Sequence, residues 1–400
     1  MTALPDPLEE VPLDRLRART SMKWRAFPAD VLPLWVAEMD VIPAEPIRRA
    51  VSRAMESGDT GYPGGDAYAE ALGSFARARW GFDGVRPERC YPVADVMVGV
   101  TEVIGLLTEP GDAVVVTAPV YPPFHAFSVH AGRRVIEARL TDTGRLDPET
   151  LERACADGRG GVLLLSNPHN PTGTVHTRAE LETAAAIAAR HSVRVVSDEI
   201  HAPLVFPGAT FTPYLSVDPR GFMVTSASKA WNLAGLKAAL VVAGPDAVAD
   251  LARMPEIVSH GASHVAVLAH AAAYAESGDW LDALNAALDR RRRLVADLLA
   301  EHAPAIGYRI PEGTFLAWLD CSRTPLADPA AVAIPGNVRL SAGPAKAFLD
   351  HGRVGLNAGE AFGSGGENHV RLNFATRLDV LTEAVERMGG VLARAESPDA

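Results

Sequence analysis

The feature that most constrains the fold is a series of continuous apolar strands alternating with helices in the middle of the chain. The predicted strands cover residues 114–116, 162–165, 193–196 and 222–224, and an amphipathic helix is predicted over 178–190. Continuous apolar strands are typical of a mostly parallel sheet that is covered on both faces. The alternation therefore predicts an α/β fold in which ligands bind beyond the carboxyl ends of the strands.

Polar residues follow several of these strands, and one such stretch, 226–232, contains a lysine between serines and an asparagine. Its sequence is Ser-Ala-Ser-Lys-Ala-Trp-Asn, and we expect Lys229 in a loop between the strand at 221–225 and a helix that begins at Leu233. Ser226, Ser228 and Lys237 could hold a phosphate close to the Lys229 amine. Pyridoxal 5'-phosphate (PLP) needs both groups, because its aldehyde forms a Schiff base with lysine. Taken alone, the motif is equally typical of a surface lysine in a serine-rich loop.

Two other strand ends supply further groups that PLP would need. Asp198, in Ser-Asp-Glu-Ile-His at 197–201, is either a helix cap or the partner of a protonated pyridine nitrogen. Asn170, in Asn-Pro-His-Asn-Pro-Thr-Gly at 167–173, can donate to the phenolic oxygen of the cofactor. We also predict that the Ala118–Pro119 and Asn170–Pro171 peptide bonds are cis.

Composition and charge argue against several other functions. A formal net charge of -11 disfavours nucleic-acid binding, and the basic run at 290–293 is expected on a solvated helix face. Three cysteines without C-x-x-C spacing predict neither a disulfide framework nor a zinc site, and no metal is expected at His260 and His264. The chain lacks both a signal-peptide pattern and a membrane-length apolar stretch. We therefore expect a cytoplasmic protein without membrane or nucleic-acid partners.

The three polar motifs, in this order and spacing, resemble those of fold-type I PLP enzymes, the class I/II aminotransferase superfamily. Within it, Trp-Val-Ala-Glu-Met-Asp at 35–40, Ser-Asn-Pro-His-Asn-Pro-Thr-Gly at 166–173 and Ser-Asp-Glu-Ile-His resemble the MalY/PatB-type cystathionine β-lyases. The resemblance covers nearly the whole chain. His201 stands where many aminotransferases of this superfamily have a tyrosine, which favours the lyase branch.

The resemblance implies a role for each matching residue. Lys229 would form the Schiff base, Asp198 would pair with the pyridinium and Tyr121 would stack on the ring, and these three form the implied catalytic set. The remaining implied cofactor contacts are Asn170, His201, Ser226, Ser228, Lys237, the backbone at Val100 and Thr101, and Tyr62 from the other subunit of a homodimer. The implied substrate contacts are Ala37, Asn170 and Arg371, with Arg371 holding the α-carboxylate. Glu102 departs from the family pattern and is expected to point away from the phosphate.

The activity implied is α,β-elimination from an amino acid with sulfur on its β-carbon, such as cystathionine or a cysteine S-conjugate, giving a thiol, pyruvate and ammonia. An aminotransferase is the alternative, since both reactions begin with removal of the α-proton by Lys229. A non-catalytic effector protein with this fold is the third hypothesis. The expected organisation is an N-terminal arm at 1–44 that packs on the small domain, a large PLP-binding domain at 45–283 and a small α+β domain at 284–400.

Overall fold

A seven-stranded sheet forms the centre of the larger part of the molecule, as the computed structural model shows for residues 5–336 and 342–396. The strand order is β2-β8-β7-β6-β5-β3-β4, and β8 alone among these seven runs against the others. The strands are β2 (Cys90–Val93), β3 (Ala113–Ala118), β4 (Arg134–Arg139), β5 (Val162–Ser166), β6 (Arg194–Asp198), β7 (Phe222–Thr225) and β8 (Ala239–Ala243). The predicted α/β fold with a mostly parallel sheet is confirmed.

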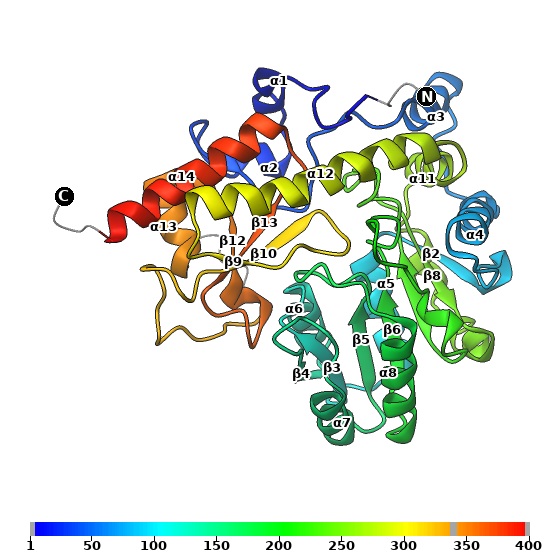
Figure 1. The fold of residues 1–400 in the computed structure, drawn as a ribbon. Coiled ribbons are helices and arrows are strands. Elements are labelled where there is room, and N and C mark those ends of the chain that lie inside the picture. The colour runs from blue at the N-terminus through cyan, green and yellow to red at the C-terminus, as the bar shows by residue number, and fades with distance from the viewer. Residues whose placement is uncertain (1–4, 337–341, 397–400) are drawn as a thin grey trace.

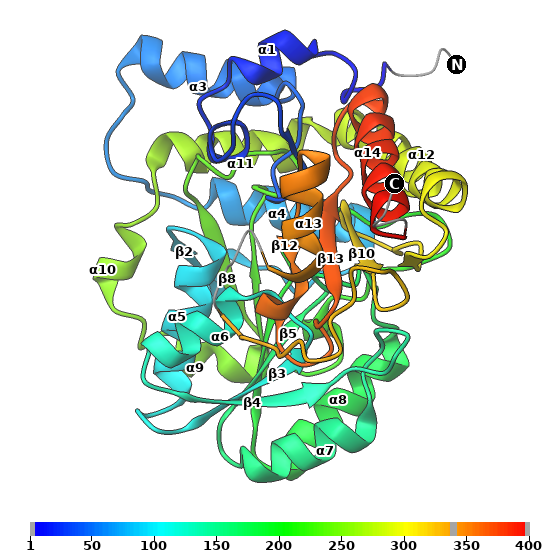
Figure 2. The same ribbon diagram turned by 90° about the vertical axis from the view of Figure 1, so that its left-hand side faces the viewer.

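Helices cover both faces of this sheet because its strands are apolar on both sides. Val114 and Val116 of β3 pack in one core with α5, while Val115 packs in another core beside α7 and α8. The helices of this part are α3 (Glu45–Ser57), α4 (Ala67–Trp80), α5 (Val96–Leu107), α6 (Pro123–His130), α7 (Pro148–Asp157), α8 (Arg178–Arg190), α9 (Val248–Leu251), α10 (Glu256–Ser259) and α11 (His264–Glu276). We call the sheet and these helices the large unit (Figures 1 and 2).

A second, four-stranded sheet, of strand order β12-β13-β10-β9, forms the small unit together with two helices. Its strands are β9 (Gly307–Tyr308), β10 (Leu316–Asp320), β12 (Asn357–Ala358) and β13 (His369–Asn373), and its helices are α13 (Gly343–Gly352) and α14 (Leu378–Glu396). The long helix α12 (Gly278–His302) runs from the large unit onto the small one, so the predicted domain boundary at 283/284 falls inside this helix (Figure 1).

The N-terminal segment contacts the small unit through strand pairing. β1 (Leu32–Pro33) runs parallel to β11 (Val354–Gly355), and the short helices α1 (Leu13–Arg17) and α2 (Met22–Arg25) precede it. Residues 34–40 form no regular structure beyond this strand, although their backbone carbonyls and amides contact the active-site region described below. In the described residues, no helix is both long and apolar enough to cross a membrane.

Two local predictions are wrong. Residues 226–238 form successive turns that join β7 to the antiparallel strand β8, so no helix begins at Leu233. The apolar run at 96–104 predicts a strand that passes into a helix, but these residues are helical from Val96 onward. A short apolar run that contains a glycine fits strand and helix patterns equally, and packing against neighbouring strands decides between them.

Candidate active site

A cavity of about 270 Å³ opens where the strand ends of the large unit approach the segment at residues 34–40. Most of the sequence-predicted site residues line it: Ala37, Tyr121, Asn170, Asp198, His201, Ser228, Lys229 and Lys237. Tyr121 follows β3, Asn170 follows β5, and the two lysines lie in the loop after β7. Asp198 is the last residue of β6, and His201 follows that strand. The parallel sheet brings these residues together because the carboxyl ends of its strands share one edge.

Lys229 is held at the wall of this cavity. Its Nζ donates a hydrogen bond to the carbonyl oxygen of Ala37 at 3.1 Å. Burial, and to a smaller extent the positive charge of Arg371, lower the pKa of this amine to about 8, while the negative charge of Asp198 opposes the shift. A larger fraction of the Lys229 amine is therefore neutral, and nucleophilic, near neutral pH than of an ordinary lysine.

Asp198 is a buried carboxyl group, and no cationic side chain of the described residues lies within salt-bridge distance of it. Its Oδ1 accepts a hydrogen bond from the Ile200 amide at 3.1 Å, and burial raises the pKa of the carboxyl to about 7. The nearby His201 is also buried, its Nδ1 has no hydrogen-bond partner, and burial lowers its pKa. The carboxylate would be stabilised by a cation in the cavity, which is what a protonated pyridine nitrogen supplies.

Arg371, on β13, is the most buried cation of the site. Its Nη1 donates to Asn170 Oδ1 at 3.0 Å, and its Nη2 donates to Asn357 Oδ1 at 2.7 Å and to the Trp35 carbonyl oxygen at 3.1 Å. Its Nε is buried without a partner, and none of the described carboxylates lies within 4.0 Å of the guanidinium. Burial lowers its pKa to about 10. A fixed guanidinium without an acidic partner is suited to a carboxylate from a ligand.

Val100 and Thr101, the predicted phosphate contacts, do not line the cavity, whereas the residues one helical turn earlier do. α5 begins at Val96, after the N-cap Asp95, so Asp95, Val96 and Met97 line the cavity. Val100 is buried in the helix, and the Thr101 hydroxyl donates to the Met97 carbonyl oxygen at 2.8 Å. The free amides of a helix lie in its first turn, which is where an anion binds.

The same shift of one turn changes the expected surroundings of the phosphate. Lys237 Nζ lies 2.8 Å from Asp95 Oδ2, so this lysine is already paired with an acid at the mouth of the site. Glu102, the expected departure from the family pattern, lies in the second turn of α5 and is absent from the cavity lining.

Ser226 and Tyr62 do not line the cavity. The Ser226 hydroxyl donates to the Ala238 carbonyl oxygen at 2.8 Å and accepts from the Ser228 amide at 3.1 Å, so Ser226 is engaged within its own loop. The side chain of Tyr62 is 86% exposed, with its ring 5.9 Å from that of His260. Tyr62 therefore contributes nothing to the cavity of its own chain.

Three asparagines that the sequence did not single out organise the site. Asn357 contacts Arg371, as described above. Asn232 Oδ1 accepts from the Met39 amide at 2.8 Å and its Nδ2 donates to the Met39 carbonyl oxygen at 2.9 Å. Asn373 Nδ2 donates to the carbonyl oxygens of Val36 and Glu38, at 2.7 Å each. Asn232 lies three residues after Lys229, and Asn373 lies two residues after Arg371. This proximity to predicted site residues is the only indication of their role in the sequence.

The predicted cis peptide bonds at Ala118–Pro119 and Asn170–Pro171 are confirmed, and Asn167–Pro168, which was not predicted, is also cis.

The fold and this set of residues define a class of protein: an α/β enzyme with a buried lysine, a buried acid and a free arginine around one cavity. Residues 95–388 match the family Aminotransferase class I and II, and the chain belongs to that family.

Named relatives span nearly the whole chain. It is 53% identical over 398 residues to the "Putative cystathionine beta-lyase" of Mycobacterium tuberculosis, covering 96% of this chain and 98% of that one. It is 35% identical to the "Cystathionine beta-lyase" of Corynebacterium glutamicum, covering 95% of this chain and 99% of that one. Among solved structures, that of cystalysin from Treponema denticola, which contains a pyridoxal 5'-phosphate cofactor, superimposes with a TM-score of 0.86 at 25% identity, covering 98% of this chain and 99% of that one.

Proposed function

We propose that this chain is a PLP-dependent carbon–sulfur β-lyase that cleaves cystathionine or a cysteine S-conjugate to a thiol, pyruvate and ammonia. The observation that carries this proposal is that Lys229 and Asp198 line one cavity and that Arg371, which has no acidic partner among the described residues, donates to Asn170 in the lining of the same cavity. The relatives named cystathionine beta-lyase support the choice of reaction.

The residues present fit PLP on several counts. Lys229 supplies an amine of lowered pKa for the aldehyde, and Asp198 supplies a buried carboxylate for the ring nitrogen. The first turn of α5, with Ser228 and Lys237, lines the end of the cavity suited to the phosphate. When bound, PLP supplies an electron sink that makes the substrate Cα–H bond acidic.

Substrate binding is assigned to the small unit and the adjoining segment. The Arg371 guanidinium takes the α-carboxylate, and Asn170, already bonded to Arg371 Nη1, holds the guanidinium in position. The 34–40 segment closes the cavity over Lys229 through Ala37 and keeps water from the reacting carbon.

The proton transfers are assigned to Lys229. Its Nζ, once free, removes the α-proton from the substrate, and burial favours the neutral amine that this step requires. Asp198 and Tyr121 line the cavity, where the Asp198 carboxylate would pair with the ring nitrogen and favour its protonated form, and the Tyr121 ring would pack against the cofactor ring. The thiolate then leaves from Cβ, so no second arginine for a distal carboxylate is needed.

We further propose that the active protein is a homodimer in which Tyr62 reaches the cofactor phosphate of the partner subunit. The exposure of Tyr62 and its absence from the cavity lining of its own chain support this assignment. A twofold dimer is the commonest assembly of soluble proteins. We also propose a cytoplasmic location, which the three free cysteines support.

The test is to incubate the cofactor-loaded protein with cystathionine and with cysteine S-conjugates, and to measure pyruvate and thiol release. We expect equal amounts of both products from wild-type protein and none from Lys229→Ala. This variant should stay folded and should still bind some PLP noncovalently, because the phosphate contacts and Asp198 remain. Conversion of 2-oxo acids to amino acids without thiol release from any sulfur substrate would contradict the lyase assignment and favour the aminotransferase alternative.

A further inference from the structure

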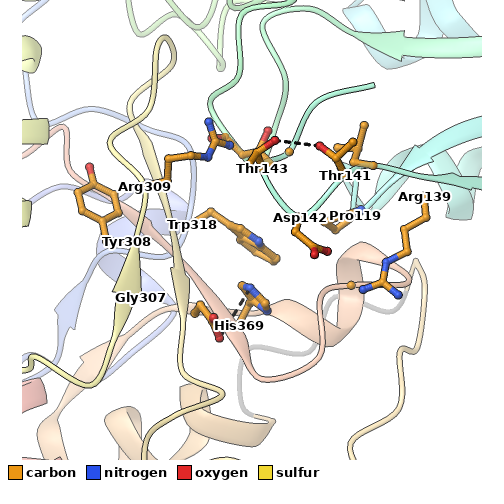
Figure 3. A pocket seen from close by; sticks show the side chains of 15 residues that line it. Pro119, Arg139, Thr141, Asp142, Thr143, Gly307, Tyr308, Arg309, Trp318 and His369 are labelled. Atoms are coloured by element: carbon orange, nitrogen blue, oxygen red, sulfur yellow. Dashed lines mark hydrogen bonds and ion pairs between the residues drawn. The ribbon is translucent and has the colours of Figure 1, made fainter. Parts of the chain in front are cut away.

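A second cavity, of about 440 Å³, lies at the junction of the large and small units (Figure 3). One wall is formed by Arg139, which is the last residue of β4, and by the loop residues 140–144 that follow it. The opposite wall comes from β9, β10 and β13 of the small unit and includes Arg309, Trp318 and His369. The proposed lyase reaction uses none of these side chains.

Trp318 gives this cavity a flat apolar surface. Its indole stacks on the imidazole of His369, with ring centroids 5.0 Å apart and planes inclined by 13°, and it meets Phe362 edge-on at 5.1 Å. These contacts fix the ring while leaving it half-buried at the cavity wall. A rigid indole of this kind is a stacking platform for another flat ring.

Two arginines at the cavity lack acidic partners. Among the described residues, no carboxylate lies within 4.0 Å of Arg309 or Arg139. Arg309 is fixed in place, because its Nη2 donates to Thr174 Oγ1 at 3.1 Å and to the Thr172 carbonyl oxygen at 3.5 Å. Partial burial lowers the pKa of Arg309, the negative charge of Glu312 opposes this shift, and the positive charge of Arg145 adds a smaller lowering. An anion at Arg309 would relieve this unfavourable environment.

The acids of the cavity do not neutralise these arginines. Asp320 accepts a hydrogen bond from the Ser322 amide at 2.8 Å and lies 4.0 Å from His369 Nε2. Asp142 projects toward the space beside Trp318. Figure 3 also shows Arg309 and Arg139 on opposite sides of the cavity, with Trp318 between them. The cavity therefore combines a flat apolar surface with cationic groups at both ends.

We propose that this cavity binds an organic carboxylate with a flat, aromatic body, whose ring stacks on Trp318 and whose carboxylate pairs with Arg309. Such a ligand would contact the large and the small unit at once, and so would bias their relative position.

The cavity is connected to the proposed substrate site through neighbouring residues. Trp318 is paired directly with Arg371 across β10 and β13, and His369 lies two residues before Arg371 on the same strand. Thr172, which accepts from Arg309, lies two residues after Asn170. Because side chains two residues apart on a strand share one face, a ligand on Trp318 and His369 lies on the face that presents Arg371. Occupancy should therefore change the KM for the amino-acid substrate more than kcat.

The test is calorimetric titration of the cofactor-loaded protein with indole-3-acetate, with uncharged indole as the comparison ligand. We expect saturable binding of indole-3-acetate that weakens about tenfold or more in Arg309→Gln and in Trp318→Leu, and about tenfold weaker binding of indole to the wild type. Arg153→Gln is the matched control, because Arg153 is an exposed arginine on α7 without a carboxylate partner in the described residues. This variant should bind like the wild type.

Three results would overturn the proposal. One is the absence of saturable binding, and another is binding that neither Arg309→Gln nor Trp318→Leu weakens. The third is binding that shifts the absorbance of the cofactor and is lost in Arg371→Lys, because the ligand would then occupy the substrate site. None of these results depends on whether the enzyme is a lyase, so this site and the proposed reaction are tested separately.

Discussion

The ion pair beneath the 34–40 segment should contribute strongly to both stability and catalysis. Lys23 Nζ lies 2.7 Å from Asp40 Oδ2, and the side chains of the pair are 0% and 1% exposed. The Trp24 indole donates to Asp40 Oδ1 at 2.9 Å, and Lys23 Nζ also donates to the Glu38 carbonyl oxygen at 3.2 Å. The cluster therefore anchors the segment whose Ala37 carbonyl oxygen accepts from Lys229.

Removing one partner of this buried pair leaves an uncompensated charge. Asp40→Ala would leave the Lys23 ammonium with the Glu38 carbonyl as its remaining partner and leave the Trp24 N–H unsatisfied. The expected loss in the free energy of unfolding is about 3–5 kcal/mol. Trp24→Phe removes one hydrogen bond to a charged group, for which about 1.5–3 kcal/mol is expected. Replacing both charges, in Lys23→Met with Asp40→Leu, should restore most of the stability, since a buried pair and apolar residues of similar size are often equivalent.

Denaturant unfolding of the wild type, of Lys23→Met, of Asp40→Leu and of the double variant, at one fixed protein and cofactor concentration, forms a double-mutant cycle that measures the coupling. The same proteins should show a raised KM, because the 34–40 segment also carries the Trp35 carbonyl oxygen that accepts from Arg371. A loss below about 1 kcal/mol for Asp40→Ala, or a double variant no more stable than the worse single variant, would refute this reasoning.

Three further predictions concern the proposed site. Arg371→Lys should raise KM about tenfold to a hundredfold, because the two parallel hydrogen bonds from the planar guanidinium to the substrate carboxylate are lost. Steady-state kinetics with cystathionine measure this KM, and an unchanged value would exclude Arg371 as the residue that binds the substrate carboxylate. In cofactor-free protein, the rate of PLP incorporation should rise with pH around a midpoint of about 8, because the lowered pKa of Lys229 makes its neutral amine available at lower pH than that of an ordinary lysine. Rapid-mixing absorbance traces measure this rate, and a midpoint above about 10 would contradict the prediction. Tyr62→Phe should weaken PLP binding without changing the dimer seen by light scattering, whereas a monomeric wild type that binds PLP fully would rule out the shared site.

Most of the large unit follows from the sequence because local signals agree there with the tertiary structure. The apolar runs at β3, β5, β6 and β7 are continuous, and α8 coincides with the predicted helix at 178–190, where Thr177 and Glu180 form a capping box. The polar residues after these strands could be assigned to one site, because the carboxyl ends of parallel strands share an edge. The lysine, the acid and the asparagine of the site were therefore accessible from the chain alone.

The errors fall where local sequence is ambiguous. The loop after Lys229 has an apolar composition compatible with a helix, but β8 pairs with β7 and leaves no room for one. The start of α5 could not be located from glycine and valine patterns, so the predicted phosphate contacts lie one turn beyond the part of α5 that lines the cavity. Asp95, which caps this helix through the Val98 amide, is a common cap residue that sequence alone does not distinguish from a solvated acid.

The contacts between distant segments are decided only by the tertiary structure. Lys229 meets Ala37 across 192 positions, Arg371 meets Trp35 across 336, and the cavity of Trp318 and Arg309 forms only where the two units meet. The sequence by itself determines most of the strands and helices of the large unit, because hydrophobic periodicity and capping act over a few residues. The pairing of a side chain with a carbonyl oxygen hundreds of residues away depends on how the completed sheets and helices pack, and no local pattern encodes that geometry.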